Sequence, residues 1–138
     1  MDSQALKEIP LFQALNDDEL ELVALFAAEV SVSEGKHLVD EGDYAYEIFV
    51  IQQGEAEVKR GGETLAVLGP GNFFGEMGLL DNQQRNASVV AKTPMRLITL
   101  SHWDVNRLTK RMPGITDALR LAAKQRYEAT PPGQPPAA

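Results

Sequence analysis

The early part of the chain carries a helical pattern of hydrophobic positions. Its apolar residues recur three or four positions apart, at Leu20, Val23, Ala24 and Ala27. Acidic residues precede this pattern, and Asn16 or Asp17 can cap the first turn, because a side-chain oxygen there accepts a hydrogen bond from a free backbone N–H. We therefore predict a helix from Leu15, preceded by a short hydrophobic hook that breaks at Pro10. The hook contains Leu6, Ile9, Leu11 and Phe12.

After Glu29 the hydrophobic period changes to two, beginning with Val30 and Val32, and this pattern indicates strands. Turn-forming residues follow at short intervals, at Glu34-Gly35, Glu41-Gly42-Asp43, Gln53-Gly54, Gly61-Gly62 and Gly69-Pro70-Gly71. The segments between these turns are the predicted strands, at residues 37–39, 47–51, 56–60, 64–68, 87–91 and 96–100. Gly61-Gly62 is a two-residue link that tolerates positive φ and closes a tight hairpin. Many short strands with regular turns predict an antiparallel jelly roll, because this arrangement buries one face of each strand and limits exposed edges.

From Ser101 the hydrophobic period becomes helical again. Ser101 is suited to cap a first helix that runs over residues 101–111. A break is predicted at Pro113-Gly114, and a second helix over about residues 115–127. The prolines that follow predict an extended, disordered and solvated tail over residues 129–138.

These elements predict one mainly β domain over residues 1–128. Its parts are an N-terminal helical part at 1–29, a β-roll at 30–100 and C-terminal helices at 101–128. The length of 138 residues suits one domain with a sizeable core and leaves little room for a second.

Composition narrows the classes of function. Hydrophobic residues make up 43% and charged residues 24%, as in soluble globular proteins. The formal net charge of -7 disfavours DNA or RNA binding, because an acidic surface repels a polyanion. The absence of cysteine removes disulfides, thiolate metal sites and thiol nucleophiles. No run approaches the ~18 apolar residues of a membrane span, and no secretion signal opens the chain, so we expect a cytoplasmic location without membrane contact.

The segment over residues 71–89 differs from an ordinary connection. It combines spaced glycines with a predicted helical turn at 77–80 and an arginine just before a strand. Backbone N–H groups at the start of a helical turn can hold phosphate oxygens, and Gly75 and Gly78 let the backbone approach a ligand closely. Arg85 adds a permanent charge with planar donors that suit a phosphate. The segment therefore predicts a binding site for an anion.

Glu76 at first contradicts an anion site, because a carboxylate repels a phosphate. The contradiction is resolved if Glu76 accepts a hydrogen bond from a neutral hydroxyl of the same ligand while Arg85 screens it from the phosphate. A ribose cyclic phosphate presents a hydroxyl and an anionic group side by side.

Two stretches resemble the phosphate-binding cassette of the cyclic nucleotide-binding domain family: Phe74-Gly75-Glu76-Met77-Gly78-Leu79-Leu80 and Arg85-Asn86-Ala87-Ser88-Val89. This family includes the regulatory subunits of protein kinase A, the bacterial catabolite activator protein and cyclic nucleotide-gated channels. The resemblance covers roughly residues 6–127, with the glycine turns and the closing helix pair in the family's order. It is specific as well as long, because the spacing from Glu76 to Arg85 agrees together with the strand entry that follows.

The resemblance implies that the ligand is cAMP or cGMP, with no further cofactor. Glu76 would hold the ribose 2′-hydroxyl, Arg85 would hold an exocyclic phosphate oxygen, and the backbone around Gly78 and Leu79 would supply amides. The implied phosphate and ribose site is Gly75, Glu76, Met77, Gly78, Leu79, Arg85, Asn86 and Ala87. Asn86 stands where the family has alanine, serine or threonine, and threonine there tends to accompany guanine recognition. The base preference therefore stays open.

The resemblance also implies a base pocket and a lid. The base would lie in its syn form against the apolar strand side chains Val58 and Val89. The final helix would close over the base through Leu119, Ala122 and Ala123, although a core stripe of that helix explains these three residues as well. Trp103, at the start of the preceding helix, is expected to pack rather than to stack on a base.

A family of this kind implies a regulatory sensor rather than an enzyme. Occupancy would pass through the C-terminal helices to a protein effector or to a larger parent chain. One alternative is a scaffold for protein interaction that has lost ligand binding, and the intact pair of Glu76 and Arg85 argues against it. A second alternative is a small jelly-roll metalloenzyme, and it lacks ligands, because His37 and His102 are the only histidines and lie far apart in the sequence.

Overall fold

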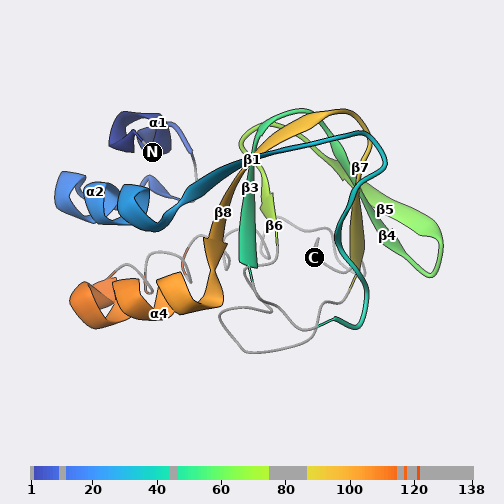
Figure 1. Ribbon diagram of the computed structural model, residues 1–138. Coiled ribbons are helices and arrows are strands. Elements are labelled where there is room, and N and C mark those ends of the chain that lie inside the picture. The colour runs from blue at the N-terminus through green and yellow to red at the C-terminus, as the bar shows by residue number, and fades with distance from the viewer. Residues whose placement is uncertain are drawn as a thin grey trace.

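The computed structural model describes residues 2–9, 12–43, 47–74, 87–114, 117 and 121. Within these ranges, eight strands form two four-stranded sheets in which all neighbouring strands are antiparallel. The first sheet has the order β1 (Ala28–Val32), β8 (Met95–Ser101), β3 (Glu47–Gln53) and β6 (Phe73–Phe74). The second has the order β2 (His37–Val39), β7 (Ser88–Ala91), β4 (Ala56–Arg60) and β5 (Glu63–Leu68). The first sheet lies between the helices and the second sheet (Figure 1).

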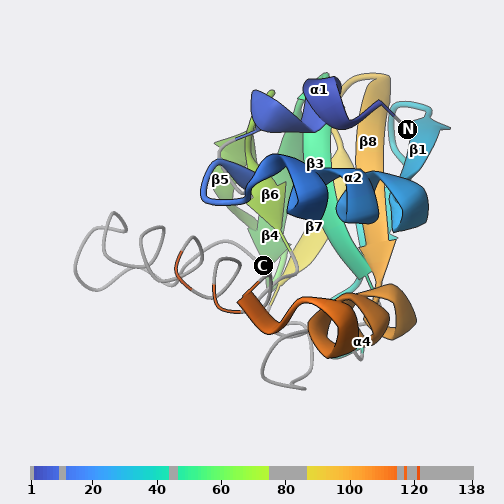
Figure 2. The ribbon, with the colours of Figure 1, turned by 90° about the vertical axis from the view of Figure 1, so that its left-hand side faces the viewer.

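The helices α1 (Ser3–Lys7), α2 (Asp17–Phe26) and α4 (His102–Arg111) lie over one face of the first sheet (Figure 2). We call the apolar cluster between them the helix-side core. It consists of Leu6, Ile9, Phe12, Leu15, Leu20, Val23, Ala24, Ile48, Val50, Phe73, Ile98, Leu100, Val105 and Leu108. The first sheet therefore buries apolar side chains on its helix-facing side.

A second cluster, the roll core, lies between the two sheets. It consists of Val39, Phe49, Ile51, Ala56, Val58, Phe74, Ala87, Val89, Ala91, Met95 and Leu97. Successive residues of β3 alternate between the two clusters, because side chains alternate between the faces of a strand. The middle of β3 is therefore buried on both faces.

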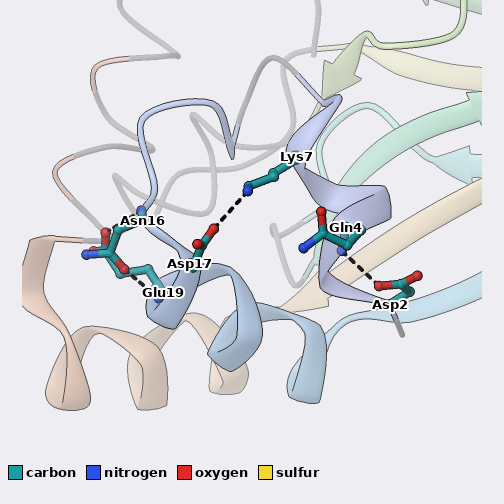
Figure 3. A network of polar contacts seen from close by, with 6 residues as sticks. All are labelled: Asp2, Gln4, Lys7, Asn16, Asp17 and Glu19. Atoms are coloured by element: carbon teal, nitrogen blue, oxygen red, sulfur yellow. Dashed lines mark hydrogen bonds and ion pairs between the residues drawn. The ribbon is translucent and has the colours of Figure 1, made fainter.

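Helix α2 begins with a reciprocal pair of hydrogen bonds, shown in Figure 3. The Glu19 N–H donates to Asn16 Oδ1 at 2.8 Å, and the Asn16 N–H donates to Glu19 Oε1 at 3.0 Å. This capping box satisfies two backbone donors at the helix start and confirms a cap at Asn16. Lys7 Nζ lies 2.9 Å from Asp17 Oδ1 and links α1 to α2, but both side chains are solvent-exposed, so the pair contributes less than about 1 kcal/mol.

Two glycine turns fix the connections of β4. Gly61 and Gly62 have φ of 58° and 85° and close the tight β4–β5 hairpin, as predicted. Gly54, between β3 and β4, has φ of 92° and packs against the start of β8. A Cβ atom on Gly54 would lie 2.5 Å from the Pro94 carbonyl oxygen. Glycine is therefore required at position 54 by both conformation and space.

The predicted mainly β fold with flanking helices is confirmed, and the predicted start of the β-roll needs correction. The β-roll begins at Ala28, two residues before the predicted start, and Val30 is 39% exposed because β1 is an edge strand of the first sheet. The predicted N-terminal helical part begins with α1, which overlaps the predicted hook at Leu6. Leu6, Ile9 and Phe12, the hook residues that the structure describes, are all buried.

The C-terminal part departs from the prediction in two ways. Helix α4 ends at Arg111 as predicted, but the break lies at Met112 rather than at Pro113-Gly114, because Pro113 and Gly114 are already helical. A proline is compatible with the first position of a helix, where no intrahelical N–H bond is needed. Trp103 is 70% exposed and packs far less than predicted. The predicted helical turn at 77–80 and the predicted tail lie outside the described residues.

Candidate functional site

Most of the predicted binding residues fall in segments that the structure does not describe. Outside the described residues lie Gly75, Glu76, Met77, Gly78, Leu79, Arg85, Asn86, Leu119, Ala122 and Ala123. Their roles stay predictions. The structure does describe the residues on either side of the segment 75–86, the strands that flank it, and Val58, Ala87 and Val89.

The segment 75–86 starts from Phe74, which is fixed deep in the roll core. Phe74 is 0% exposed and pairs with Phe49 across β6 and β3. Their rings stack with centroids 4.9 Å apart and an angle of 10° between the ring planes. The neighbouring Phe73 belongs to the helix-side core instead. Adjacent residues at the start of the segment are thus held in two different clusters.

The turn before β6 sets the direction in which the chain enters the sheet. The Gly69 N–H donates to Asn72 Oδ1 at 2.8 Å, and the Gly71 N–H donates to the Ile51 carbonyl oxygen at 2.8 Å. Gly71 has φ of 87°, in the region that favours glycine. This turn ties β6 to the end of β3.

Ala87 directly follows the segment 75–86, and it is also completely buried in the roll core. β7 begins at the next residue and places Val89 in the same cluster. Ala87 directly precedes β7, and its role at the strand entry of the cassette stays a prediction. Phe74 and Ala87, the described residues on either side of the segment that carries Glu76 and Arg85, therefore both lie in the roll core.

The two predicted base contacts lie together. Val58 and Val89 are directly opposite each other on β4 and β7, and both are 0% exposed. They lie on the inner face of the second sheet, within the roll core. This burial agrees with an apolar lining, while contact with a base remains a prediction.

A polar connection beside the site was not found from the sequence. The Glu41 N–H donates to Ser88 Oγ at 2.8 Å, across 47 positions of sequence. The Gly61 N–H donates to Glu41 Oε2 at 3.3 Å. We call these two contacts the Glu41 bridge. No local pattern marks them, because the three residues come together only when β2, β4 and β7 pair.

Other kinds of site find little support in the part of the chain that the structure describes. No three His, Cys, Asp or Glu side chains gather there in a way that could hold a metal ion. No helix among the described residues has the length and apolar character needed to cross a membrane. A cavity of about 340 Å³ lies between α1 and the end of β3, with Glu8, Gln52 and Arg96 in its wall. None of the described residues predicted to contact the ligand lines it.

Comparison with known proteins agrees with this arrangement. A family model described as a cyclic nucleotide-binding domain matches residues 29–112. The cyclic AMP receptor protein of Thermus thermophilus is 35% identical over 130 residues, covering 90% of this chain and 60% of that protein. The regulatory subunit of cAMP-dependent protein kinase from Schizosaccharomyces pombe is 34% identical over 104 residues, covering 75% of this chain and 25% of that protein. The chain thus spans only part of the length of these relatives.

A solved structure is similar over nearly its whole length. The N-terminal domain of a transcriptional regulator from Streptomyces coelicolor A3(2) has a TM-score of 0.76 and 31% sequence identity, with 93% of this chain and 92% of that domain covered. The solved structure has a similar fold, and the family model covers both sheets and α4. Both findings agree with the predicted jelly roll. The chain belongs to the cyclic nucleotide-binding domain family.

Proposed function

We propose that this chain binds a cyclic nucleotide, with cAMP the first candidate and cGMP the second, and passes its occupancy on through the C-terminal helices. The observation that carries the proposal is that Phe74 and Ala87, the residues on either side of segment 75–86, are both buried in the roll core. A segment held at both ends loses less conformational freedom when a ligand orders it. The names of the relatives, a cyclic AMP receptor protein and a cAMP-dependent kinase subunit, favour cAMP.

In this proposal two side chains bind different parts of the ligand. Arg85 pairs with the negatively charged cyclic phosphate, and Glu76 accepts a hydrogen bond from the ribose 2′-hydroxyl. Backbone amides around Gly78 and Leu79 complete the phosphate site. Val58 and Val89 line the base pocket, and Leu119, Ala122 and Ala123 close over the base.

The proposed output is regulatory, and the proposed location is the cytoplasm. A ligand shifts a conformational equilibrium only by the difference between its affinities for the two states. The C-terminal helices must therefore differ in position between the free and the bound chain, and a protein effector or a parent chain must read that difference. We propose no catalytic step, so cyclic nucleotide recovered after incubation should be chemically unchanged.

Isothermal titration of the whole chain with cAMP, cGMP and 5′-AMP tests the proposal directly. We expect saturable binding of one cyclic nucleotide per chain and much weaker binding of 5′-AMP, which lacks the ring phosphate. Binding of neither cyclic nucleotide would favour the scaffold alternative, in which the fold is kept and the ligand is lost.

Arg85→Ala is expected to weaken cAMP binding by about 1.5–3 kcal/mol, because a charge-assisted hydrogen bond to phosphate is removed. Titration of the purified variant measures this loss. Arg96→Ala is a matched control, because Arg96 lies on β8, is 53% exposed and pairs with Glu29 at 3.3 Å. An Arg85→Ala variant with the affinity of the Arg96→Ala variant would contradict the assigned role.

Glu76→Gln is expected to weaken cAMP binding but to leave the binding of 2′-deoxy-cAMP nearly unchanged. The carboxylate is proposed to accept a hydrogen bond from the 2′-hydroxyl, and the deoxy analogue has no such donor. Titration of the wild type and of Glu76→Gln with cAMP and with 2′-deoxy-cAMP forms a thermodynamic cycle that isolates this contact. Equal losses for the two ligands would place Glu76 elsewhere in the site.

A further inference from the structure

The Glu41 bridge crosses the first residue of β7. In the second sheet β7 lies between β2 and β4. Glu41 follows the end of β2, and Gly61 follows the end of β4. The Glu41 backbone N–H donates a hydrogen bond to Ser88 Oγ at 2.8 Å. The Glu41 carboxylate accepts one from the Gly61 N–H at 3.3 Å. One residue therefore joins the two connections on either side of β7.

The strand register explains why these residues meet. Val39 of β2 is opposite Val89, and Lys59 of β4 is opposite Ser88. Because both pairs are antiparallel, the chain beyond β2 and the chain beyond β4 run past the N-terminal end of β7. That end is where the segment 75–86 returns to the roll.

We propose that Ser88 is a positioning residue for the ligand site and that the Glu41 bridge holds the returning end of segment 75–86. This inference rests on the proposed function. Arg85 precedes Ser88 by three residues, so it lies within about 10 Å of Ser88 along the chain. The buried Ala87 lies between them. Fixing Ser88 and Ala87 limits the positions that the Arg85 backbone can take.

The expected effect follows from conformational entropy. Fixing the backbone of one residue costs about 1–2 kcal/mol of conformational entropy. If the residue is not already ordered in the free protein, this cost is subtracted from the free energy of ligand binding. Without the Ser88 hydroxyl the β2–β3 connection loses the hydrogen bond from the Glu41 N–H to β7. The ligand then orders more of the chain when it binds, and its affinity falls although no ligand contact is removed.

The far end of β7 offers a matched control. The Glu55 N–H donates to Thr93 Oγ1 at 3.0 Å, across 38 positions of sequence. Thr93 follows β7 just as Ser88 begins it. Both hydroxyls accept one hydrogen bond from the backbone of a distant connection. The Thr93 hydroxyl also donates to the Pro94 carbonyl oxygen at 3.0 Å, so its loss should lower the free energy of unfolding at least as much as loss of the Ser88 hydroxyl. Only Ser88 is next to the segment that carries Arg85.

The test compares four proteins by titration with cAMP and by thermal unfolding: wild type, Ser88→Ala, Ser88→Thr and Thr93→Val. We expect Ser88→Ala to bind roughly 3- to 10-fold more weakly than wild type, the equivalent of one neutral hydrogen bond. Ser88→Thr keeps the hydroxyl and should restore binding to within about twofold, and Thr93→Val should bind like wild type while unfolding at a lower temperature, as Ser88→Ala does.

The outcomes separate the two proposals. Equal affinity of Ser88→Ala and Thr93→Val for cAMP, beside a wild type that binds, would overturn the positioning role and leave the proposed function standing. A wild type that binds no cyclic nucleotide would overturn the proposed function and the positioning role with it. Weak binding by Ser88→Ala that Ser88→Thr restores supports both.

Discussion

Replacing Phe74 with alanine is expected to lower the free energy of unfolding by about 3–5 kcal/mol. The ring is completely buried, and its removal leaves a cavity in the roll core beside the stacked ring of Phe49. Because β6 is only two residues long, its backbone offers little to hold the start of segment 75–86 once this side chain is gone. Urea denaturation followed by circular dichroism measures the loss.

Two further variants keep this prediction testable if Phe74→Ala does not fold. Phe74→Leu retains much of the side-chain volume, so a loss of roughly 1–2 kcal/mol is expected. Trp103→Ala removes an aromatic ring that is 70% exposed on α4, and the expected change is below about 1 kcal/mol. A Phe74→Leu loss no larger than that of Trp103→Ala would contradict the anchoring role.

Gly54→Ala is expected to destabilise the fold by about 2–5 kcal/mol. Its φ of 92° is unfavourable for a residue with a Cβ atom, by about 1–2 kcal/mol. The added carbon would also lie 2.5 Å from the Pro94 carbonyl oxygen and 2.8 Å from Met95 Cγ. Relieving this overlap moves the β3–β4 connection or the start of β8 and adds about 1–3 kcal/mol.

Gly35→Ala separates the two contributions to the Gly54 effect. Gly35 has a similar φ of 85°, but nothing lies within 4 Å of an added Cβ atom there. Its substitution should therefore cost only the conformational part, about 1–2 kcal/mol. Equal losses of unfolding free energy for the two variants would show that the contact with Pro94 is relieved at no cost.

Turns were more predictable than burial in this sequence. The glycines at 61 and 62 identify a hairpin from local conformation alone, and Asn16 marks a helix start for the same reason. The middle of β3 is a continuous apolar run rather than an alternating one, and Ile48, Phe49 and Val50 are all buried, without the sequence showing what covers each face. Helices on one face and the second sheet on the other bury both sides, and only the tertiary fold reveals this.

The wrong predictions at Val30, Pro113 and Trp103 also arise because local sequence does not reveal the tertiary surroundings. Val30 alternates correctly with its neighbours, but β1 lies at the edge of its sheet and leaves the side chain partly exposed. Pro113 was interpreted as a helix breaker, although proline also suits the first turn of a new helix. Trp103 was expected to pack because tryptophan usually does, and sequence does not tell which side of α4 faces the core.

The candidate site was predictable to the extent that it is contiguous. Residues 74–89 carry their pattern within one short stretch, so their spacing could be recognised. The contact between Glu41 and Ser88 joins residues 47 positions apart and depends on the pairing of three strands. Nothing in the local sequence marks either residue, and the fold was needed to bring them together.

The match to the family begins at residue 29, but the cooperative unit that folds starts earlier. Half of the helix-side core comes from residues before β1, in α1, in α2 and in the connection between them. A shortened chain beginning at residue 29 would keep α4 but would leave Ile48, Val50, Ile98 and Leu100 without the part of their covering layer that α1 and α2 supply. Such a fragment should aggregate or remain partly unfolded, because a large exposed apolar sheet face associates with other apolar surfaces in water. The smallest part of the chain expected to fold on its own therefore includes the N-terminal helices.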